Sequence, residues 1–264
     1  IKVLACKYVI NNDITVIVPT EKRFLKDRKI SEEDEIDIQL KPSICKLHVC
    51  SGISSPEQAA DALREKFPKS EIVFADPSAF VLPDDQKDIT IIFRKDYIKS
   101  GQILTYPEIV ILGIENGDTS NRLYGVAIDI GTTTVVAKLF DLNEGVYLAT
   151  SAAANPQSIR GDDVISRINY ASNGKGLKDL QKIIVKCLDS LIEETCKDAG
   201  ISPQDIYEIC VAGNTTMNHI FLALPVKQLG EAPYKAYSLE SRNLNPAEIG
   251  LNINSTANVH TIEN

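Results

Sequence analysis

Apolar and polar positions follow two patterns in the second half of the chain, and each predicts a buried element. Residues 124–130 form a nearly continuous apolar run that only Asp129 interrupts, which is typical of a buried strand. Residues 177–199 repeat apolar side chains at helical spacing, and Gly200 stands where a glycine commonly ends a helix. Further strands are expected at 135–141, 146–153 and 206–212, and further helices at 162–171 and up to about 225. Residues after 230 carry little pattern.

The first half of the chain predicts a smaller α/β unit ahead of this region. A helix is expected at 56–67, with Ser55 as its N-cap and Pro56 at its first position. A turn at 115–118 marks the end of the unit. Its strands are expected at 45–49, 71–75, 89–94 and 109–114. Two strands are also expected at 2–10 and 14–18, ahead of a charge-dense stretch at 21–40 that is typical of a linker.

Composition and charge are those of an ordinary globular protein. The 264 residues are 44% hydrophobic and 24% charged, which excludes a disordered, collagenous or coiled-coil chain. The net charge of −8 disfavours binding to nucleic acid or to anionic membranes, but not a small anion at a local site. No apolar run approaches the roughly 18 residues of a membrane span, and we expect no signal peptide. We therefore expect a cytoplasmic protein. Because the chain starts at Ile1, we also expect it to be part of a longer protein.

The cysteines and histidines indicate no metal site by themselves. The spacing of Cys45 and Cys50 matches the start of an iron–sulfur run, but Ile53 occupies the third position and the run fails. We interpret these cysteines as buried, reduced thiols within a strand pattern. The three histidines are scattered along the chain: His48, His219 and His260.

The first candidate binding motif lies at 129–134, between two strands. A strand on each side excludes a Walker loop and a Rossmann turn, since both need a helix after the glycine loop. A hairpin can still bind phosphate through backbone N–H groups and hydroxyls, while Asp129 holds a hydrated Mg²⁺. The alternative is a simple β-turn with an Asp–Thr side-chain hydrogen bond.

Two further motifs carry polar groups at the ends of secondary-structure elements. Residues 213–216 join a strand to a helix, which suits either an anion or a plain Asn/Thr helix cap. Asp162 and Asp163 lie at a helix start, where they cap the helix or act as a base or metal ligand.

Together the three motifs resemble the first lobe of the superfamily of actin, sugar kinases and heat-shock-chaperone ATPases. Longer strings are similar to the ATP-dependent reductive activators of corrinoid proteins. These strings are YGVAIDIGTTT at 124–134, NPQ at 155–157, GDDVISRI at 161–168 and VAGNTTMNH at 211–219.

The resemblance implies the order of the domains. Members of this family carry a 2Fe–2S ferredoxin domain, a linker, a middle domain and an ATPase-like domain. Residues 1–20 would be the C-terminal tail of the ferredoxin domain, and 21–40 the linker. Residues 41–120 would be the small α/β middle domain. Residues 121–264 would be the incomplete first lobe of an actin-like (ribonuclease H-like) ATPase domain, an α/β fold with a mixed sheet flanked by helices.

The resemblance also implies cofactors and site residues. ATP and Mg²⁺ would bind here, with Asp129 and Asp162 as catalytic residues and Asp129 contacting Mg²⁺ through water. Cys6 would be the fourth ligand of a 2Fe–2S cluster in the full-length protein; the other three ligands would lie upstream, so this chain alone would hold no cluster. The remaining cofactor-binding residues would be Gly131, Thr132, Thr133, Thr134, Gly213, Asn214, Thr215 and Thr216.

The implied function is ATP-coupled, low-potential electron transfer that returns Co(II) corrinoid proteins to Co(I). The partner would be a corrinoid protein or a corrinoid-dependent methyltransferase, and a homodimer is compatible with this reading. One alternative is a small-molecule kinase of the same superfamily, with Asp162 or Asp163 as base. A second alternative is a non-catalytic docking module with a nucleotide fold.

One departure from the family concerns ATP hydrolysis. A complete two-lobed ATPase needs a second phosphate loop and an adenine-binding segment, and neither is found in this sequence. Residues 125–264 make up about one lobe, so we expect that the chain alone does not hydrolyse ATP efficiently.

Overall fold

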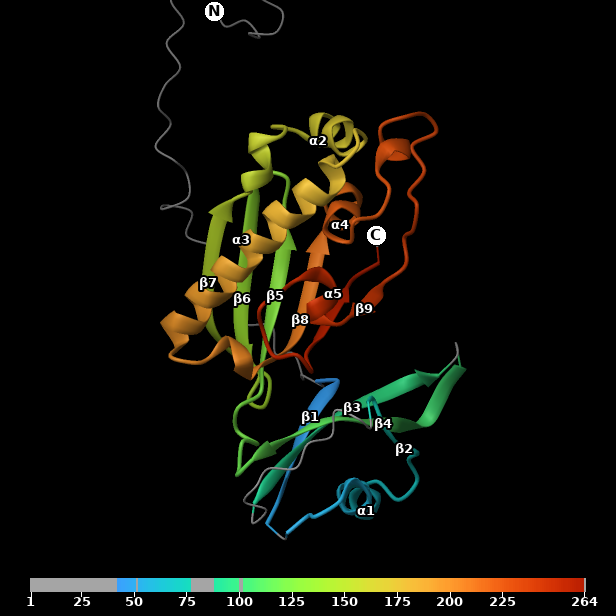
Figure 1. Ribbon diagram of the computed structural model, residues 1–264, viewed down its shortest axis with the longest axis vertical. Coiled ribbons are helices and arrows are strands. Elements are labelled where there is room, and N and C mark those ends of the chain that lie inside the picture. Colours follow the sequence, from blue (N-terminus) through green and yellow to red (C-terminus); the bar gives the residue numbers. More distant parts are fainter. Residues whose placement is uncertain (1–41, 51, 77–87, 100–101, 264) are drawn as a thin grey trace, which may run out of the picture. The chain divides into compact units, whose positions relative to one another are not determined.

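The computed structural model describes residues 42–50, 52–76, 88–99 and 102–263. They fall within the unit Asp37–Asn264, and Figure 1 shows their helices and strands. The expectations for residues 1–20, including Cys6, and for the linker at 21–40 lie outside the described residues. Within the described parts, no helix is both long and apolar enough to cross a membrane.

The first half of the described chain builds a four-stranded sheet in the order β1-β3-β4-β2. Strand β3 pairs antiparallel with both β1 and β4, whereas β2 runs parallel to β4. The strands are β1 (Ile44–Val49), β2 (Ile72–Phe74), β3 (Ile89–Lys99) and β4 (Gln102–Asn116).

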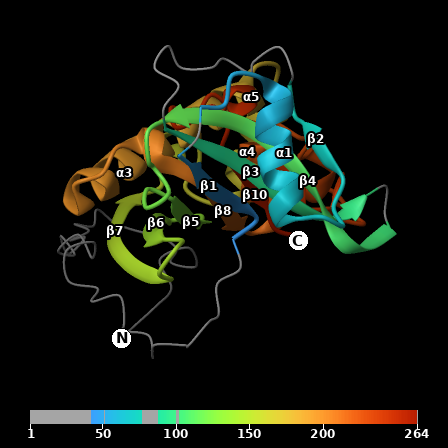
Figure 2. The same ribbon diagram turned by 90° about the horizontal axis from the view of Figure 1, so that it is seen from below.

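Helix α1 (Pro56–Lys66) packs on this sheet. Its N-cap is Ser55, as expected, because the serine hydroxyl accepts a hydrogen bond from the amide of Gln58. The helix buries one face against the apolar side chains of β3 and β4, and Figure 2 shows α1 lying across these strands. The buried residues of α1 are Ala59, Ala60 and Leu63.

The second half builds a six-stranded mixed sheet in the order β7-β6-β5-β8-β10-β9. Strands β5, β6 and β7 form an antiparallel meander; β8 runs parallel to β5, β10 runs parallel to β8, and β9 pairs antiparallel with β10. The strands are β5 (Tyr124–Ile130), β6 (Thr134–Asp141), β7 (Val146–Ala154), β8 (Ile206–Gly213), β9 (Arg242–Leu244) and β10 (Asn258–Thr261). The expected α/β class, with a mixed sheet and helices, is confirmed.

Helices cover one face of this sheet. The long helix α3 (Gly176–Ala199) runs across the meander (Figure 1), and Gly200 ends it in the left-handed conformation with φ of 71°. Its buried leucines and isoleucines share a core with alternate residues of β5. The other helices are α2 (Val164–Ala171), α4 (Thr215–Phe221) and α5 (Pro246–Ile249), with 3₁₀ turns η3 (Pro156–Ile159), η4 (Pro203–Asp205) and η5 (Lys227–Leu229).

Candidate functional site

Two of the polar motifs meet at one edge of the six-stranded sheet. Strands β5 and β8 are parallel with Ile130 opposite Gly213, so their carboxyl ends reach the same edge. There the amide Nδ2 of Asn214 donates a hydrogen bond of 3.1 Å to the hydroxyl of Thr132. The structure thus places the segment after β5 beside the segment after β8, although more than 80 residues separate them in the sequence.

The segment after β5 is a tight hairpin that requires glycine at its first position. The amide of Gly131 donates a hydrogen bond of 2.9 Å to the carbonyl of Thr134 and closes the turn. A Cβ on Gly131 would lie 2.5 Å from that same carbonyl oxygen, closer than side chains approach backbone atoms. Only glycine therefore allows this turn without a shift of the backbone.

Three backbone carbonyl groups of the hairpin accept hydrogen bonds from residues that pack behind the loop. Asn155 accounts for two of them: its Nδ2 donates to the carbonyl of Gly131 (2.8 Å), and its own amide donates to the carbonyl of Thr133 (2.8 Å). Between these two, Arg167 donates from Nη2 to the carbonyl of Thr132 (2.7 Å). Three consecutive carbonyls are thereby fixed on the protein side of the loop.

The amide N–H groups of the hairpin are left available as a result. Among the described residues, nothing accepts a hydrogen bond from the N–H of Thr132 or of Thr133. Thr133 is exposed and Thr132 is half-buried, so neither residue is enclosed by the core. Consecutive free N–H groups of this kind form a concavity that binds anions.

Asp129 lies next to this hairpin on the exposed face of β5. Strand alternation sends Ile128 and Ile130 into the core and Asp129 to the opposite face, where its side chain is exposed. In the described chain, no hydrogen bond joins its carboxylate to a hairpin threonine. The β-turn alternative with an Asp–Thr bond is therefore not the geometry observed, and the carboxylate is free to contact a hydrated cation.

The segment after β8 combines a helix cap with the contact to the hairpin. Asn214 is the N-cap of α4, and its Oδ1 accepts a hydrogen bond of 3.0 Å from the amide of Met217. Thr215 is half-buried and Thr216 is buried, so Asn214 is the exposed member of this motif. The helix-cap interpretation holds for Asn214, and its other amide atom still reaches the hairpin.

The two acidic residues at 162–163 differ in their contacts. Asp163 is the N-cap of α2 in a capping box with Ser166, and hydrogen bonds from Ser166 lower the pKa of the Asp163 carboxyl. Asp162 is exposed, and no hydrogen bond joins it to Asp129 or to the hairpin within the described ranges. A catalytic role for Asp162 stays a prediction.

Arg167 is the residue of this site whose role the sequence did not indicate. Its side chain is fully buried, and burial lowers the pKa of its guanidinium. Besides the Thr132 carbonyl it binds the carbonyl of Gly161 through Nε (2.9 Å), which ties the start of α2 to the hairpin. An arginine on the buried side of an amphipathic helix was the one available signal, since buried charges normally have partners.

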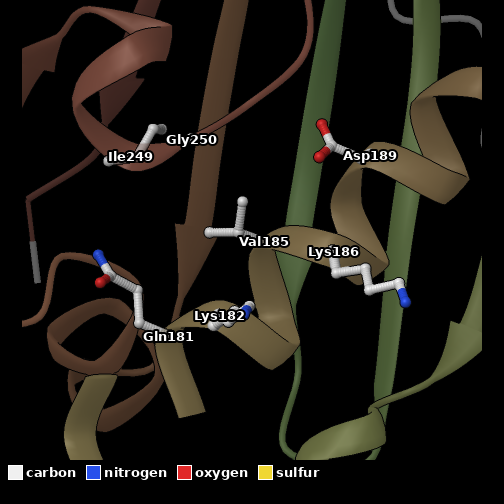
Figure 3. Close-up of a pocket in the computed structure, with 7 residues that line it drawn as sticks. All are labelled: Gln181, Lys182, Val185, Lys186, Asp189, Ile249 and Gly250. Atoms are coloured by element: carbon white, nitrogen blue, oxygen red, sulfur yellow. The ribbon is translucent and has the colours of Figure 1, made fainter. Parts of the chain in front are cut away.

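Two surface hollows in the described part of the chain lie away from the hairpin. One of them, with a volume of 340 Å³, lies between α3 and α5 (Figure 3). Its polar lining includes Asp189, whose carboxylate accepts a hydrogen bond of 2.9 Å from the amide of Asn252. No hairpin residue lines it.

Comparisons with known proteins find a matching family model, a related protein and a similar solved structure. A family model described as the RACo middle region matches residues 124–264, more than half of the chain and starting at the first residue of β5. The corrinoid activation enzyme RamQ of Eubacterium limosum is 30% identical over 262 residues, which cover 98% of this chain and 43% of that protein. A solved reductive activator for corrinoid, iron–sulfur protein superposes with a TM-score of 0.71 at 28% identity, over 87% of this chain and 37% of the other. The chain thus spans less than half the length of either relative.

Proposed function

The chain belongs to the family described as the RACo middle region, and from that premise we propose that it is part of a reductive activator of corrinoid proteins. The names of the relative from Eubacterium limosum and of the superposed structure support this proposal. In the proposed reaction, one electron passes from an iron–sulfur cluster to the cobalt of a corrinoid protein and converts Co(II) to Co(I). The partner is a corrinoid protein or a corrinoid-dependent methyltransferase.

The electron donor is proposed to be a 2Fe–2S cluster of the longer protein, with Cys6 as one of its ligands. We propose that the described region contributes the nucleotide site. ATP acts there by shifting the equilibrium between domain arrangements that differ in how they dock the partner, and not by phosphorylating a substrate.

One observation carries the nucleotide proposal. The hairpin presents two free backbone N–H groups, whereas its carbonyl groups accept hydrogen bonds from Asn155 and Arg167 on the protein side. Gly131, Thr132, Thr133 and Thr134 would bind a phosphate group through this backbone and the adjacent hydroxyls. Gly213, Asn214, Thr215 and Thr216 would form the adjoining wall of the site.

The exposed carboxylate of Asp129 fits a magnesium ion bound through water, because Mg²⁺ prefers oxygen ligands and keeps part of its hydration shell. When bound, the ion would offset the negative charge of the phosphates, which matters in a chain of net charge −8. Buried Arg167, directly behind the hairpin, adds positive charge on the protein side. Asp162 is the second acidic residue proposed to act in catalysis, and the Gly161–Arg167 contact brings its segment to the hairpin.

The decisive experiment measures the reduction of a Co(II) corrinoid protein by the longer protein with its cluster rebuilt. A low-potential reductant supplies electrons, and the rate is followed by the absorbance of Co(I) with and without ATP and Mg²⁺. ATP is expected to accelerate the reaction, and Thr132→Val, which removes the hydroxyl but keeps the N–H group, is expected to reduce the acceleration. An equal rate with and without ATP would refute the proposed coupling.

A further inference from the structure

The four-stranded sheet brings together three potential metal ligands that are scattered in the sequence. His48 and Cys50 are two positions apart at the end of β1, so their side chains lie on the same face of the strand. The antiparallel register pairs Val49 with Ile89, which places Asp88, just before β3, opposite Cys50. Two strand ends that lie about 40 residues apart in sequence thus contribute to one cluster.

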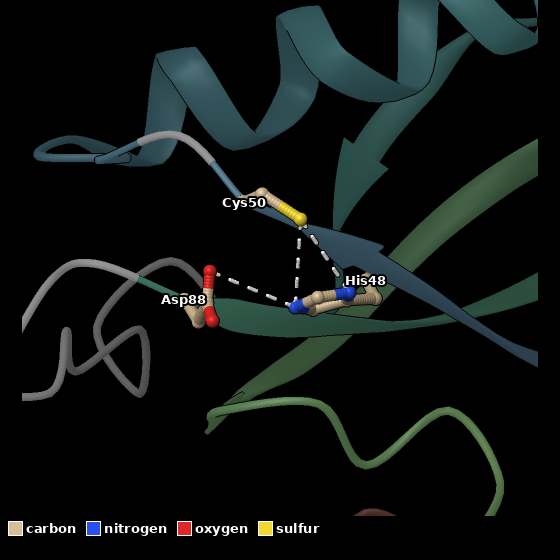
Figure 4. A group of neighbouring side chains, drawn as sticks. All are labelled: His48, Cys50 and Asp88. Atoms are coloured by element: carbon tan, nitrogen blue, oxygen red, sulfur yellow. Dashed lines mark hydrogen bonds and ion pairs between the residues drawn. The ribbon is translucent and has the colours of Figure 1, made fainter.

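The ligand atoms of these residues converge (Figure 4). The His48 Nε2 atom lies 3.8 Å from a carboxylate oxygen of Asp88 and 4.0 Å from the Cys50 sulfur. One ligand atom from each of the three residues lies within 4.8 Å of the other two. A tetrahedral Zn²⁺, with Zn–S of about 2.3 Å and Zn–N of about 2.0 Å, holds its ligand atoms roughly 3.3–3.6 Å apart. The Cys50 sulfur also lies 3.8 Å from His48 Nδ1, so the Cys50 side chain must turn toward Nε2 for the three ligand atoms to reach that range.

A second carboxylate orients the histidine ring from its other side. Asp118 Oδ2 lies 3.5 Å from His48 Nδ1, while Asp118 Oδ1 accepts hydrogen bonds from the amide and the hydroxyl of Ser120 (3.0 and 2.6 Å). The turn carrying Asp118 is itself tied to the Asp88 segment, because the amide of Gly117 donates to the carbonyl of Asp88 (2.8 Å). A carboxylate on the far nitrogen of a ligating histidine is the usual support of a zinc site.

We propose that His48 Nε2, Cys50 Sγ and the Asp88 carboxylate bind a Zn²⁺ ion, with Asp118 holding the Nδ1–H of His48. The set combines imidazole, thiolate and carboxylate, which suits borderline-soft Zn²⁺ better than the all-oxygen preference of Mg²⁺ or Ca²⁺. The deprotonated Cys50 and Asp88 neutralise the two charges of the ion, and the fourth position is open to water. Cys50 and Asp88 are exposed, so an ion reaches the site directly.

The test measures zinc binding by the 264-residue chain, purified with a non-thiol reductant and free of any cluster. Zinc content after dialysis and competition with a chromophoric chelator give the stoichiometry and the affinity. Co²⁺ serves as a spectroscopic probe, because a thiolate ligand gives it a near-ultraviolet charge-transfer band. The variants are Cys50→Ser, His48→Gln, Asp88→Asn and Asp118→Asn, with Cys210→Ser, an exposed cysteine of the other sheet, as the matched control.

The wild-type chain is expected to bind one more zinc ion than Cys50→Ser or His48→Gln, and only Cys210→Ser should retain the wild-type affinity. Asp118→Asn should weaken binding about tenfold without abolishing it. Thermal unfolding of the metal-free variants checks that they fold as the wild type does. Equal zinc content and affinity in the wild type and in His48→Gln, or no zinc retained by the wild type, would overturn the proposal.

Discussion

The guanidinium of Arg167 donates a hydrogen bond of 2.7 Å to the carbonyl oxygen of Thr132, the central residue of the proposed phosphate hairpin. The side chain is fully buried, and in the described chain no carboxylate lies within ion-pair distance of it. Its remaining partners are neutral, among them the carbonyl of Gly161 and the sulfur of Met217 (3.3 Å). The carboxylates of Asp162 and Asp163 act on this charge only from beyond ion-pair distance, so the buried cation next to the free N–H groups favours a bound anion on the open side of the hairpin.

Replacing Arg167 by lysine should impair both stability and nucleotide binding. Lysine keeps the charge but cannot reach the carbonyls of Thr132 and Gly161 with one planar group, so buried acceptors lose their partners. We expect the free energy of unfolding to fall by about 2 kcal/mol and ATP binding to weaken. Urea unfolding and nucleotide titration measure the two effects. Arg160→Lys, at an exposed pair with Asp179, is the control and should change stability by no more than about 0.5 kcal/mol.

Gly131→Ala should distort the hairpin. The added Cβ would meet the Thr134 carbonyl oxygen at 2.5 Å, so the turn must open. We expect a loss of about 1–3 kcal/mol in the free energy of unfolding together with loss of ATP binding. The matched control is Gly113→Ala, where the nearest atom to the new Cβ, in Thr256, is 3.5 Å away. Equal stability of the two variants would contradict the hairpin geometry.

Asp129→Asn should weaken cation binding and leave the stability of the fold nearly unchanged. The Asp129 side chain is exposed, so stability should change by less than about 0.5 kcal/mol. Binding of Mg²⁺–ATP should weaken by on the order of tenfold, because a water-mediated carboxylate contact to the ion is lost. Isothermal titration of ATP with and without Mg²⁺ makes this measurement, and Asp198→Asn, exposed in the last turn of α3, is the control. An unchanged affinity for Mg²⁺–ATP would remove Asp129 from the site.

His219 should make the protein less stable in mild acid. It is buried, and burial lowers the pKa of its imidazole below the ordinary value of 6.5. Nδ1 lies 2.7 Å from the carbonyl of Thr215 and Nε2 accepts from the amide of Ser238 (3.4 Å), which fixes one neutral tautomer. Below pH 6.5 the unfolded chain binds a proton that the folded chain does not, so stability falls as the pH falls.

The change is at most about 1.4 kcal/mol per pH unit for one group. Urea unfolding at pH 7.5, 6.5 and 5.5 should show a flatter pH dependence in His219→Gln than in the wild type. The difference between the two proteins isolates this group from the other titrating residues. Identical slopes would show that His219 takes up its proton equally in both states.

Local signals in the sequence were sufficient where one segment determines its own structure. The bounds of β5 were predicted to the residue because its apolar run is buried, and Gly200 ends α3 in the left-handed conformation that glycine favours. Ser55 likewise caps α1 as its sequence indicates.

Features that depend on partners distant in the sequence were missed. Strand β10 is a short segment without a pattern of its own, and it is a strand because it pairs in parallel with Glu208–Val211 of β8. The hydrogen bonds of Arg167 depend on the hairpin some 35 residues earlier. The strand pattern predicts a buried Cys50, but Cys50 is exposed because β1 ends at Val49, one residue before it. Its proximity to Asp88 follows from the register of β1 with β3, which the sequence does not state.

The carboxamide of Asn214 has a consequence for how this position varies among relatives. Serine, threonine, aspartate and asparagine normally replace one another at helix caps, because each offers an oxygen to the first turn. At position 214 the oxygen caps α4 while the nitrogen of the same group binds Thr132. Aspartate has no N–H to donate, so the Thr132 hydroxyl would have to become the donor, and serine would be too short to span both contacts. Replacement of Asn214 by another capping residue would therefore lose or reverse one of its two contacts. We expect asparagine at this position in relatives that keep the hydrogen bond between the two loops.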